Sequence, residues 1–372
     1  MEPGSAKDLS TIKSPEALKI LVIQQKMIGD VLVSSILVRN LRKAYPEAQI
    51  DYMVHESTTP VLQGNKDFDR LIIFKPEHRQ NKLAFYRLLK DIRKEKYDVV
   101  IDAYAKLESY LIALFSGAKR KISYKKSITD LIYTDTVERE DIPDSKLGLI
   151  IEHRLALLKP LQLNVELETR PKLHVTGEEK SFARELFRKN GIDDSRKTIM
   201  LSIIGSMETK TYPFEYMARL IDHIASQGEM NLLFNYIPSQ KAEAERLLAL
   251  CKESTRQKIY FEVLGKSLRE FIAIMEKCDM IIGNDGGAIN MAKALNKPSF
   301  IIFSPWIDKR GWATFEDGIN NISLHLKDFR PEAFEDKTPS EIKKQSDSFY
   351  NQFTPEMIIP ALSKFLQTHL KA

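Results

Sequence analysis

Cysteine and long apolar runs are scarce in this chain of 372 residues. Its two cysteines, Cys251 and Cys278, are spaced for neither a metal site nor a redox pair, so we expect inert thiols in a reducing compartment. No apolar stretch reaches the roughly 18 uncharged residues that a membrane-spanning helix needs, and the polar N-terminus lacks the apolar core of a secretory signal. These absences predict a cytoplasmic protein.

Two further absences narrow the chemistry. No Gly-x-Gly-x-x-Gly motif follows the first predicted strand, which argues against a dinucleotide-dependent oxidoreductase. His55 and His153 have no partners at the spacing of metal ligands, so we expect structural roles for both. The net charge of +5 is too small to indicate a nucleic-acid partner by itself. We therefore expect no cofactor, no metal and no nucleic acid.

Short apolar runs that alternate with amphipathic stretches indicate an α/β fold built on doubly wound parallel sheets. The apolar content of 43% is enough to fill the cores of two domains of roughly 150 to 200 residues each. The predicted strands span residues 20–23, 50–54, 71–74, 99–101, 198–204, 231–235, 259–261, 280–282 and 299–303. The predicted helices span residues 31–44, 82–96, 149–161, 178–190, 214–227, 239–252, 267–277 and 355–370.

An irregular polar piece at residues 164–172 separates the two predicted domains. We expect a flexible segment at 1–17, a first Rossmann-like domain at 18–172 and a second at 173–354. The remaining residues, 355–372, hold the last helix, which is long enough to pack back toward the first domain.

The turn after the first strand, Gln24 to Asp30, contains a candidate catalytic carboxylate. Ligands of open α/β sheets lie beyond the carboxyl ends of the strands, where this turn is expected. Gly29 permits a tight entry into the next helix, whose dipole stabilises an ionised Asp30 in its first turn. Such a carboxylate can act as a general base toward a hydroxyl. The alternative is an ordinary helix N-cap.

The turn after the first strand of the second half contains candidate phosphate ligands. Gly205, Ser206 and Thr209 can offer backbone and hydroxyl donors to a diphosphate, and Lys210 can offer a positive charge. The alternative is a solvated loop with a surface lysine.

The segment at residues 280–295 combines a carboxylate with two glycines at a strand-to-helix junction. Asp285 can accept hydrogen bonds from sugar hydroxyls, while the amides of Gly286 and Gly287 can approach an anion closely. Trp306 could add a stacking surface for sugar, or it could simply pack under a loop. The pattern favours a nucleotide-sugar site, although two glycines can also serve only a tight turn.

Four motifs in the same order and at similar spacing resemble those of the bacterial lipopolysaccharide heptosyltransferases, glycosyltransferase family 9. They lie at residues 20–32, 210–213, 264–268 and 284–298. The resemblance implies the GT-B architecture, in which two Rossmann-like domains face each other across a cleft. It also implies a metal-independent, inverting transferase that moves a sugar, usually from ADP-heptose, onto a lipopolysaccharide core or a related glycolipid.

The same resemblance assigns roles to individual residues. Asp30 falls on the catalytic base, with Lys26 and Gly29 beside it on the acceptor side, and Lys210 falls on the lysine that binds the diphosphate. Asp285 would contact the donor sugar. The other residues implied at the donor site are Thr209, Gly205, Ser206, Gly286, Gly287 and Asn290, with Ser239 and Gln240 near the nucleoside.

Two departures from the family pattern leave the donor open. Asn290 stands where a histidine is common, and Gly286 where serine or threonine is frequent. Asn290 can donate a hydrogen bond but carries no charge, so neutralisation of the phosphates would depend more on Lys210. A different nucleotide-sugar, or a catalytically silent binding protein with this fold, therefore remains an alternative.

Basic residues are concentrated between residues 75 and 126, where 14 Lys and Arg stand against 6 Asp and Glu. On the predicted helix at 82–96, apolar and basic side chains interleave. This tract favours an anionic glycolipid acceptor and peripheral contact with the cytoplasmic face of the inner membrane, although solubility alone could also explain it.

Overall fold

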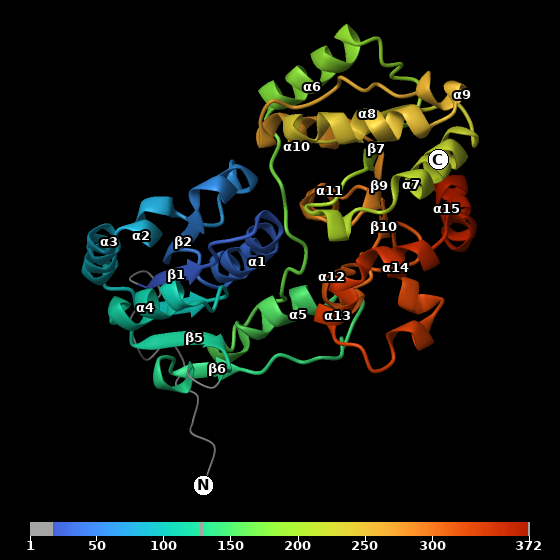
Figure 1. Ribbon diagram of the computed structural model, residues 1–372. Coiled ribbons are helices and arrows are strands. Elements are labelled where there is room, and N and C mark those ends of the chain that lie inside the picture. Colours follow the sequence, from blue (N-terminus) through green and yellow to red (C-terminus); the bar gives the residue numbers. More distant parts are fainter. Residues whose placement is uncertain (1–17, 127–128, 371–372) are drawn as a thin grey trace. The chain divides into compact units, whose positions relative to one another are not determined.

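The computed structural model describes residues 18–126 and 129–370, and the chain divides into two compact units after His174 (Figure 1). This division lies two residues beyond the predicted boundary. The predicted flexible segment at 1–17 lies outside the described residues.

The first unit is built on a parallel six-stranded sheet with the order β3-β2-β1-β4-β5-β6. The order reverses between β1 and β4, and this reversal is where a doubly wound sheet opens a crevice for a ligand. Its strands are β1 (Lys19–Ile23), β2 (Gln49–His55), β3 (Arg70–Phe74), β4 (Val99–Asp102), β5 (Arg120–Tyr124) and β6 (Asp135–Val137). Its α-helices are α1 (Ile28–Ala44), α2 (Pro76–Gln80), α3 (Lys82–Glu95), α4 (Leu107–Ser116) and α5 (Leu149–Ala156).

The second unit has a parallel five-stranded sheet with the order β11-β10-β9-β7-β8, so its reversal lies between β7 and β9. Its strands are β7 (Thr198–Ser202), β8 (Asn231–Asn235), β9 (Met280–Asn284), β10 (Ser299–Ile302) and β11 (Asn321–Leu324). Its α-helices are α6 (Gly177–Lys189), α7 (Phe214–Ala225), α8 (Lys241–Leu250), α9 (Glu253–Arg256), α10 (Leu268–Lys277), α11 (Gly287–Ala294), α12 (Lys309–Trp312), α13 (Pro339–Lys344), α14 (Ser346–Gln352) and α15 (Pro355–Leu370).

Alternate residues of the second sheet enter two separate cores. On β7, Ile199 and Leu201 join the core beneath α7, α8, α14 and α15, whereas Met200 joins the core beneath α6, α10 and α11. Because both faces are covered, the strands read as continuous apolar runs rather than as alternating ones. The α/β prediction is thereby confirmed for this unit.

The last helix, α15, packs against α7 within the second unit, whereas we expected it to pack toward the first domain. Its buried residues Ile358, Leu362 and Phe365 recur at helical spacing and share one core with the sheet. The ring of Phe365 lies 5.7 Å from the ring of Phe300 on β10. The apolar stripe of α15 is thus used within its own unit.

The predicted elements differ from the structure in several places, and strands β5, β6 and β11 and helix α4 were not predicted. The strand predicted at 259–261 is only a single bridge between Ile259 and Leu232, and the ring of Phe261 lies 4.9 Å from that of Tyr236. The helix predicted at 149–161 ends at Ala156 and is followed by a 3-10 turn that contains Pro160, which cannot continue an α-helix. Helix α1 begins at Ile28, before the predicted start at residue 31.

The polar piece at 164–172 is irregular, as predicted, and it is fixed to α1 by the buried side chain of Asn40. The amide of Asn40 donates to the carbonyl of Glu168 at 2.8 Å, and its oxygen accepts the N–H of the same residue at 2.7 Å. This paired contact satisfies backbone groups that no strand or helix would satisfy.

Candidate active site

The two predicted donor-site segments meet at the reversal point of the second sheet. Lys210 follows β7 and Asp285 follows β9, and the ammonium of Lys210 donates to Oδ2 of Asp285 at 3.1 Å. The other carboxylate oxygen, Oδ1, accepts the N–H of Ser304 at 3.1 Å, so the loop after β10 joins the same cluster. Both charged side chains are mostly buried, with 17% and 10% exposed. The loops after β7 and β9 therefore lie in direct contact.

The backbone of the loop after β7 is fixed by a side chain of β9. Asn284 donates to the carbonyl of Ser202 at 3.0 Å and accepts the N–H of Tyr212 at 2.9 Å, which clamps both ends of the loop. Gly205 is required within it, because an added Cβ would lie 2.3 Å from the carbonyl oxygen of Lys210. The loop thus presents Lys210 from a fixed position.

Trp306 holds this loop from the other side. Its indole N–H donates to the carbonyl of Thr209 at 2.9 Å, and the hydroxyl of Ser304 donates to the same oxygen at 2.7 Å. The ring lies 5.4 Å from the ammonium of Lys210 and 4.5 Å from that of Lys343 on α13. Lys343 is a second positive charge near the site, and no motif in the sequence points to it.

The start of α11 presents open backbone amides beside this cluster. An added Cβ at Gly286 or Gly287 would meet no atom within 4 Å, so the space in front of both glycines is open. The first amides of a helix have no acceptor within it and point along the positive end of its dipole, which favours an anion. Asn290 lies half-buried one turn further along, and Ser206 is exposed on the facing loop.

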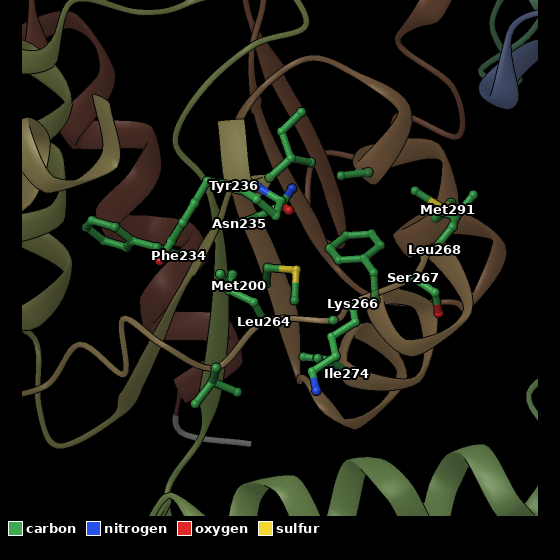
Figure 2. Close-up of a pocket in the computed structure, with 16 residues that line it drawn as sticks. Met200, Phe234, Asn235, Tyr236, Leu264, Lys266, Ser267, Leu268, Ile274 and Met291 are labelled. Atoms are coloured by element: carbon green, nitrogen blue, oxygen red, sulfur yellow. The ribbon is translucent and has the colours of Figure 1, made fainter. Parts of the chain in front are cut away.

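An apolar pocket of about 370 Å³ adjoins the start of α11 (Figure 2). Its walls come from the end of β8, the loop before α10 and α11 itself, and Figure 2 shows their side chains around one hollow. Lys266 and Ser267 add polar groups at its rim. The apolar residues that define it include Met200, Phe234, Tyr236, Val263, Leu264, Phe271, Ala288 and Met291. Apolar and aromatic walls with a few polar groups can accept an aromatic base.

The two residues predicted near the nucleoside do not line this apolar pocket, although Pro238 directly before them does, and their role stays a prediction. Ser239 is exposed, and Gln240 lines a second, more polar hollow together with Gly205 and Ser206. The side-chain oxygen of Gln240 accepts the N–H of Ile237 at 3.2 Å, which closes a 3-10 turn after β8. The segment at 264–268, which the sequence indicated only through its resemblance, lines the apolar pocket instead.

In the first unit, Asp30 lies in the first turn of α1 as predicted. Its Oδ2 accepts the N–H of Met27 at 3.3 Å, and its Oδ1 accepts Nη2 of Arg154 at 3.2 Å. Burial raises the pKa of Asp30, and the cation of Arg154 opposes that rise. A carboxylate whose pKa is raised is a stronger base once ionised. Lys26 lies half-buried in the adjacent loop, and Gly29 is buried in the same helical turn.

Arg154 on α5 is the residue of this site that the sequence did not reveal. It is buried, and its guanidinium donates to Ser34 Oγ at 2.6 Å, to the hydroxyl of Tyr124 at 2.6 Å and to Gln24 Oε1 at 3.3 Å. These contacts fix the position of the Arg154 guanidinium, which in turn holds Asp30. The sequence offers no clear signal for it, because Arg154 follows Glu152 and His153 in a helix of mixed polar and apolar residues.

Across residues 18–126 and 129–370, no three His, Cys, Asp or Glu side chains gather as metal ligands would. Metal independence stays a prediction.

Comparison with known proteins identifies the family. The model of glycosyltransferase family 9 (heptosyltransferase) matches residues 85–337, more than half of the chain. Lipopolysaccharide heptosyltransferase 1 of Campylobacter coli is 24% identical over 314 residues, which cover 82% of this chain and 89% of the relative.

Two solved structures share the fold. A family 9 glycosyl transferase from Veillonella parvula superposes with a TM-score of 0.76 at 17% identity, covering 94% of this chain and 97% of that one. The E. coli heptosyltransferase WaaC with ADP gives a TM-score of 0.63 at 17% identity, covering 89% of this chain and 100% of that one. The resemblance inferred from the four motifs is thereby confirmed. The chain belongs to glycosyltransferase family 9, and it is a glycosyltransferase of GT-B fold with two Rossmann-like domains.

Proposed function

We propose that this protein transfers heptose from ADP-heptose onto a lipopolysaccharide core or related glycolipid, with inversion and without a metal. The observation that carries the proposal is the cluster of Lys210, Asp285 and the open start of α11 beside an apolar pocket. The names of the relatives support the choice of sugar and acceptor, since they include a lipopolysaccharide heptosyltransferase and a heptosyltransferase solved with ADP.

The donor binds along the second unit. Its base enters the apolar pocket, and its diphosphate lies against the amides of Gly286 and Gly287, where the helix dipole and the ammonium of Lys210 oppose the negative charge. Asp285, fixed by Ser304 and Lys210, accepts hydrogen bonds from the hydroxyls of the sugar. The same contacts stabilise the nucleoside diphosphate as it leaves.

The reaction is a single displacement at the anomeric carbon. Asp30 accepts the proton of an acceptor hydroxyl, whose oxygen forms the new bond to the anomeric carbon. The bond from that carbon to the diphosphate oxygen breaks on the opposite side, and its electron pair leaves with the nucleotide, so the configuration inverts. Arg154 keeps Asp30 oriented during this step.

A different nucleotide-sugar is the second candidate, because Asn290 and Gly286 depart from the family pattern at the site where the diphosphate binds. Neither residue supplies a positive charge or a hydroxyl there. The apolar pocket limits the shape of a base more than its identity, since few of its lining groups are polar. A catalytically silent binding protein is the third candidate.

The test is to incubate the protein with ADP-heptose or with UDP-sugars and a heptose-deficient lipopolysaccharide core, and to follow the product by mass spectrometry. We expect the acceptor to gain the mass of one heptose when ADP-heptose is the donor, and no mass when a UDP-sugar is the donor. Transfer only from a UDP-sugar would establish the second candidate. Calorimetric binding of nucleotides without any transfer would leave the binding protein.

Because the proposed acceptor is a lipid, we propose that the reaction takes place at the cytoplasmic face of the inner membrane. None of the described helices has both the length and the apolar character that crossing a bilayer requires.

A further inference from the structure

Helix α4 turns apolar side chains outward. Leu107, Leu114 and Phe115 are 69%, 47% and 47% exposed, and they recur at the i, i+7, i+8 spacing that lies on one face of a helix. Leu111, between them, is only half-buried. A surface helix normally directs charged and polar residues to water. An outward apolar stripe of this kind indicates that something covers it in use.

Helix α3 lies beside α4 and adds to this surface. Arg79, just before α3, binds Glu108 at the start of α4 with 2.7 Å between Nε and Oε1. At the other end, the guanidinium of Arg93 lies where a Cβ of Gly117 would be, just after α4. The two helices therefore run side by side in the same direction. Exposed residues of α3 include Leu83 at 55% and Tyr86 at 53%.

Basic side chains lie on the same two helices as the apolar ones, and the acidic residues of α3, Asp91 and Glu95, are paired with Lys94 and Arg70. Lys106 and Lys119 are exposed at the two ends of α4, while Arg87 and Lys90 are exposed on α3. The ammonium of Lys90 lies 5.8 Å from the ring centroid of Tyr86, so the cation and an exposed aromatic ring share one location. Glu108, the one acidic residue within α4, is paired with Arg79.

This combination favours one kind of partner. Apolar residues that can enter an acyl layer, with lysines and arginines at the level of the headgroups, are the pattern of a helix that lies in the plane of a membrane surface. Anionic lipids attract such a surface through charge.

We propose that the α3–α4 surface, defined by α3, α4, Lys106 and Lys119, docks on an anionic lipid bilayer, with Leu107, Leu114 and Phe115 entering it. The inference rests on the proposed function in that the acceptor is a glycolipid. Docking itself needs neither donor nor acceptor, so it can be measured separately.

The test is co-sedimentation of the purified protein with phosphatidylglycerol vesicles and with phosphatidylcholine vesicles. The parent protein binds the anionic vesicles and binds less as salt rises. The variant L114E/F115E places two charges on the stripe and lowers the vesicle partition coefficient by at least about tenfold. L250E is the matched control, because Leu250 on α8 is similarly exposed at 46% but belongs to the second unit.

A second variant separates charge from apolar contact. K90E/K119E lowers binding to phosphatidylglycerol vesicles at low salt and changes little at high salt, where screening already removes the attraction. Because both residues are exposed, we expect the variant to fold as the parent does.

Three outcomes would overturn the inference. The first is no binding of the parent protein to anionic vesicles at low salt, and the second is equal binding by L114E/F115E. The third is a parent dimer, seen by light scattering, that L114E/F115E converts to monomer without altering vesicle binding, because the stripe would then cover a second copy of the chain.

Enzyme assays distinguish this inference from the proposed function. L114E/F115E should transfer sugar to a deacylated, water-soluble core as the parent does, yet transfer less to a core embedded in anionic vesicles. If neither protein transfers any sugar while the vesicle results hold, the proposed function fails and the docking surface stands.

Discussion

The candidate sites of the two units differ in the groups that form them, which are side chains in the first unit and largely backbone amides in the second. In the first unit, one carboxylate is held by a buried side-chain network centred on Arg154, which binds four side chains from three other elements or loops. In the second unit, one ion pair lies beside open backbone amides, and an apolar pocket adjoins the same helix start. The contrast fits the proposed roles, since a general base needs one fixed group, whereas binding an anion needs space and accessible donors.

Loss of Asp30 should have the largest effect. Asp30→Asn keeps the shape of the side chain and its ability to contact Arg154, but it removes the base. Turnover should fall by roughly 10² to 10⁴, which is the range that general-base catalysis supplies. Steady-state kinetics with a saturating donor measures the loss, and turnover within a few-fold of the parent would remove Asp30 from the mechanism.

Loss of Lys210 should weaken donor binding. Lys210→Met removes the charge nearest to the proposed diphosphate and leaves Asp285 without its partner, so affinity for ADP should fall by roughly tenfold to a hundredfold, the value of a charged hydrogen bond. Lys343→Met serves as the control, because Lys343 also lies over Trp306, whereas the ion pair with Asp285 is made by Lys210, so its loss should matter less. Equal losses in both variants would mean that general charge, rather than Lys210, binds the donor.

Gly205 and Gly287 differ in the space around them, so substitutions at the two positions should have different effects. Gly205→Ala forces a Cβ against the backbone of Lys210, so it should destabilise the protein by about 1 to 3 kcal/mol, as overpacking does. Gly287→Val fills open space instead, so it should weaken ADP binding with little change in melting temperature. Thermal unfolding with and without ADP measures both, and a stable Gly205→Ala protein would argue against the fixed loop.

The smallest expected effect is a shift in pH dependence. Burial raises the pKa of Asp30, so turnover should fall on the acid side at a higher pH than an ordinary aspartate would give. Because the cation of Arg154 lowers that pKa, Arg154→Gln should move the acid limb further upward, whereas Arg154→Lys should move it less. Melting temperatures of both variants verify folding. An unmoved limb in Arg154→Gln would show that another group titrates.

The sequence predicted the site where a motif directly follows a strand. Asp30, Lys210 and Asp285 each come soon after an apolar run, and parallel strands place such residues at one edge of their sheet. Arg154 could not be predicted in this way, because it reaches Asp30 from 124 residues away and only tertiary packing brings them together.

The loop after β8 shows a second limit. The resemblance implies Ser239 and Gln240 near the nucleoside, and this stays a prediction; in the structure both lie in a 3-10 turn, Pro238–Gln240. The apolar pocket combines residues up to Pro238 with the loop before α10 and with α11, a combination that sequence spacing did not predict. Sequence spacing locates the edge of a sheet, but it does not give the direction of the turns beyond it.

Calorimetric titration of ADP-heptose into Asp30→Asn and Lys210→Met tests most directly whether catalysis and donor binding depend on different residues. We expect Asp30→Asn to bind the donor as tightly as the parent does and Lys210→Met to bind it at least about tenfold more weakly. Equal weakening in the two variants, or weakening only in Asp30→Asn, would contradict this expectation.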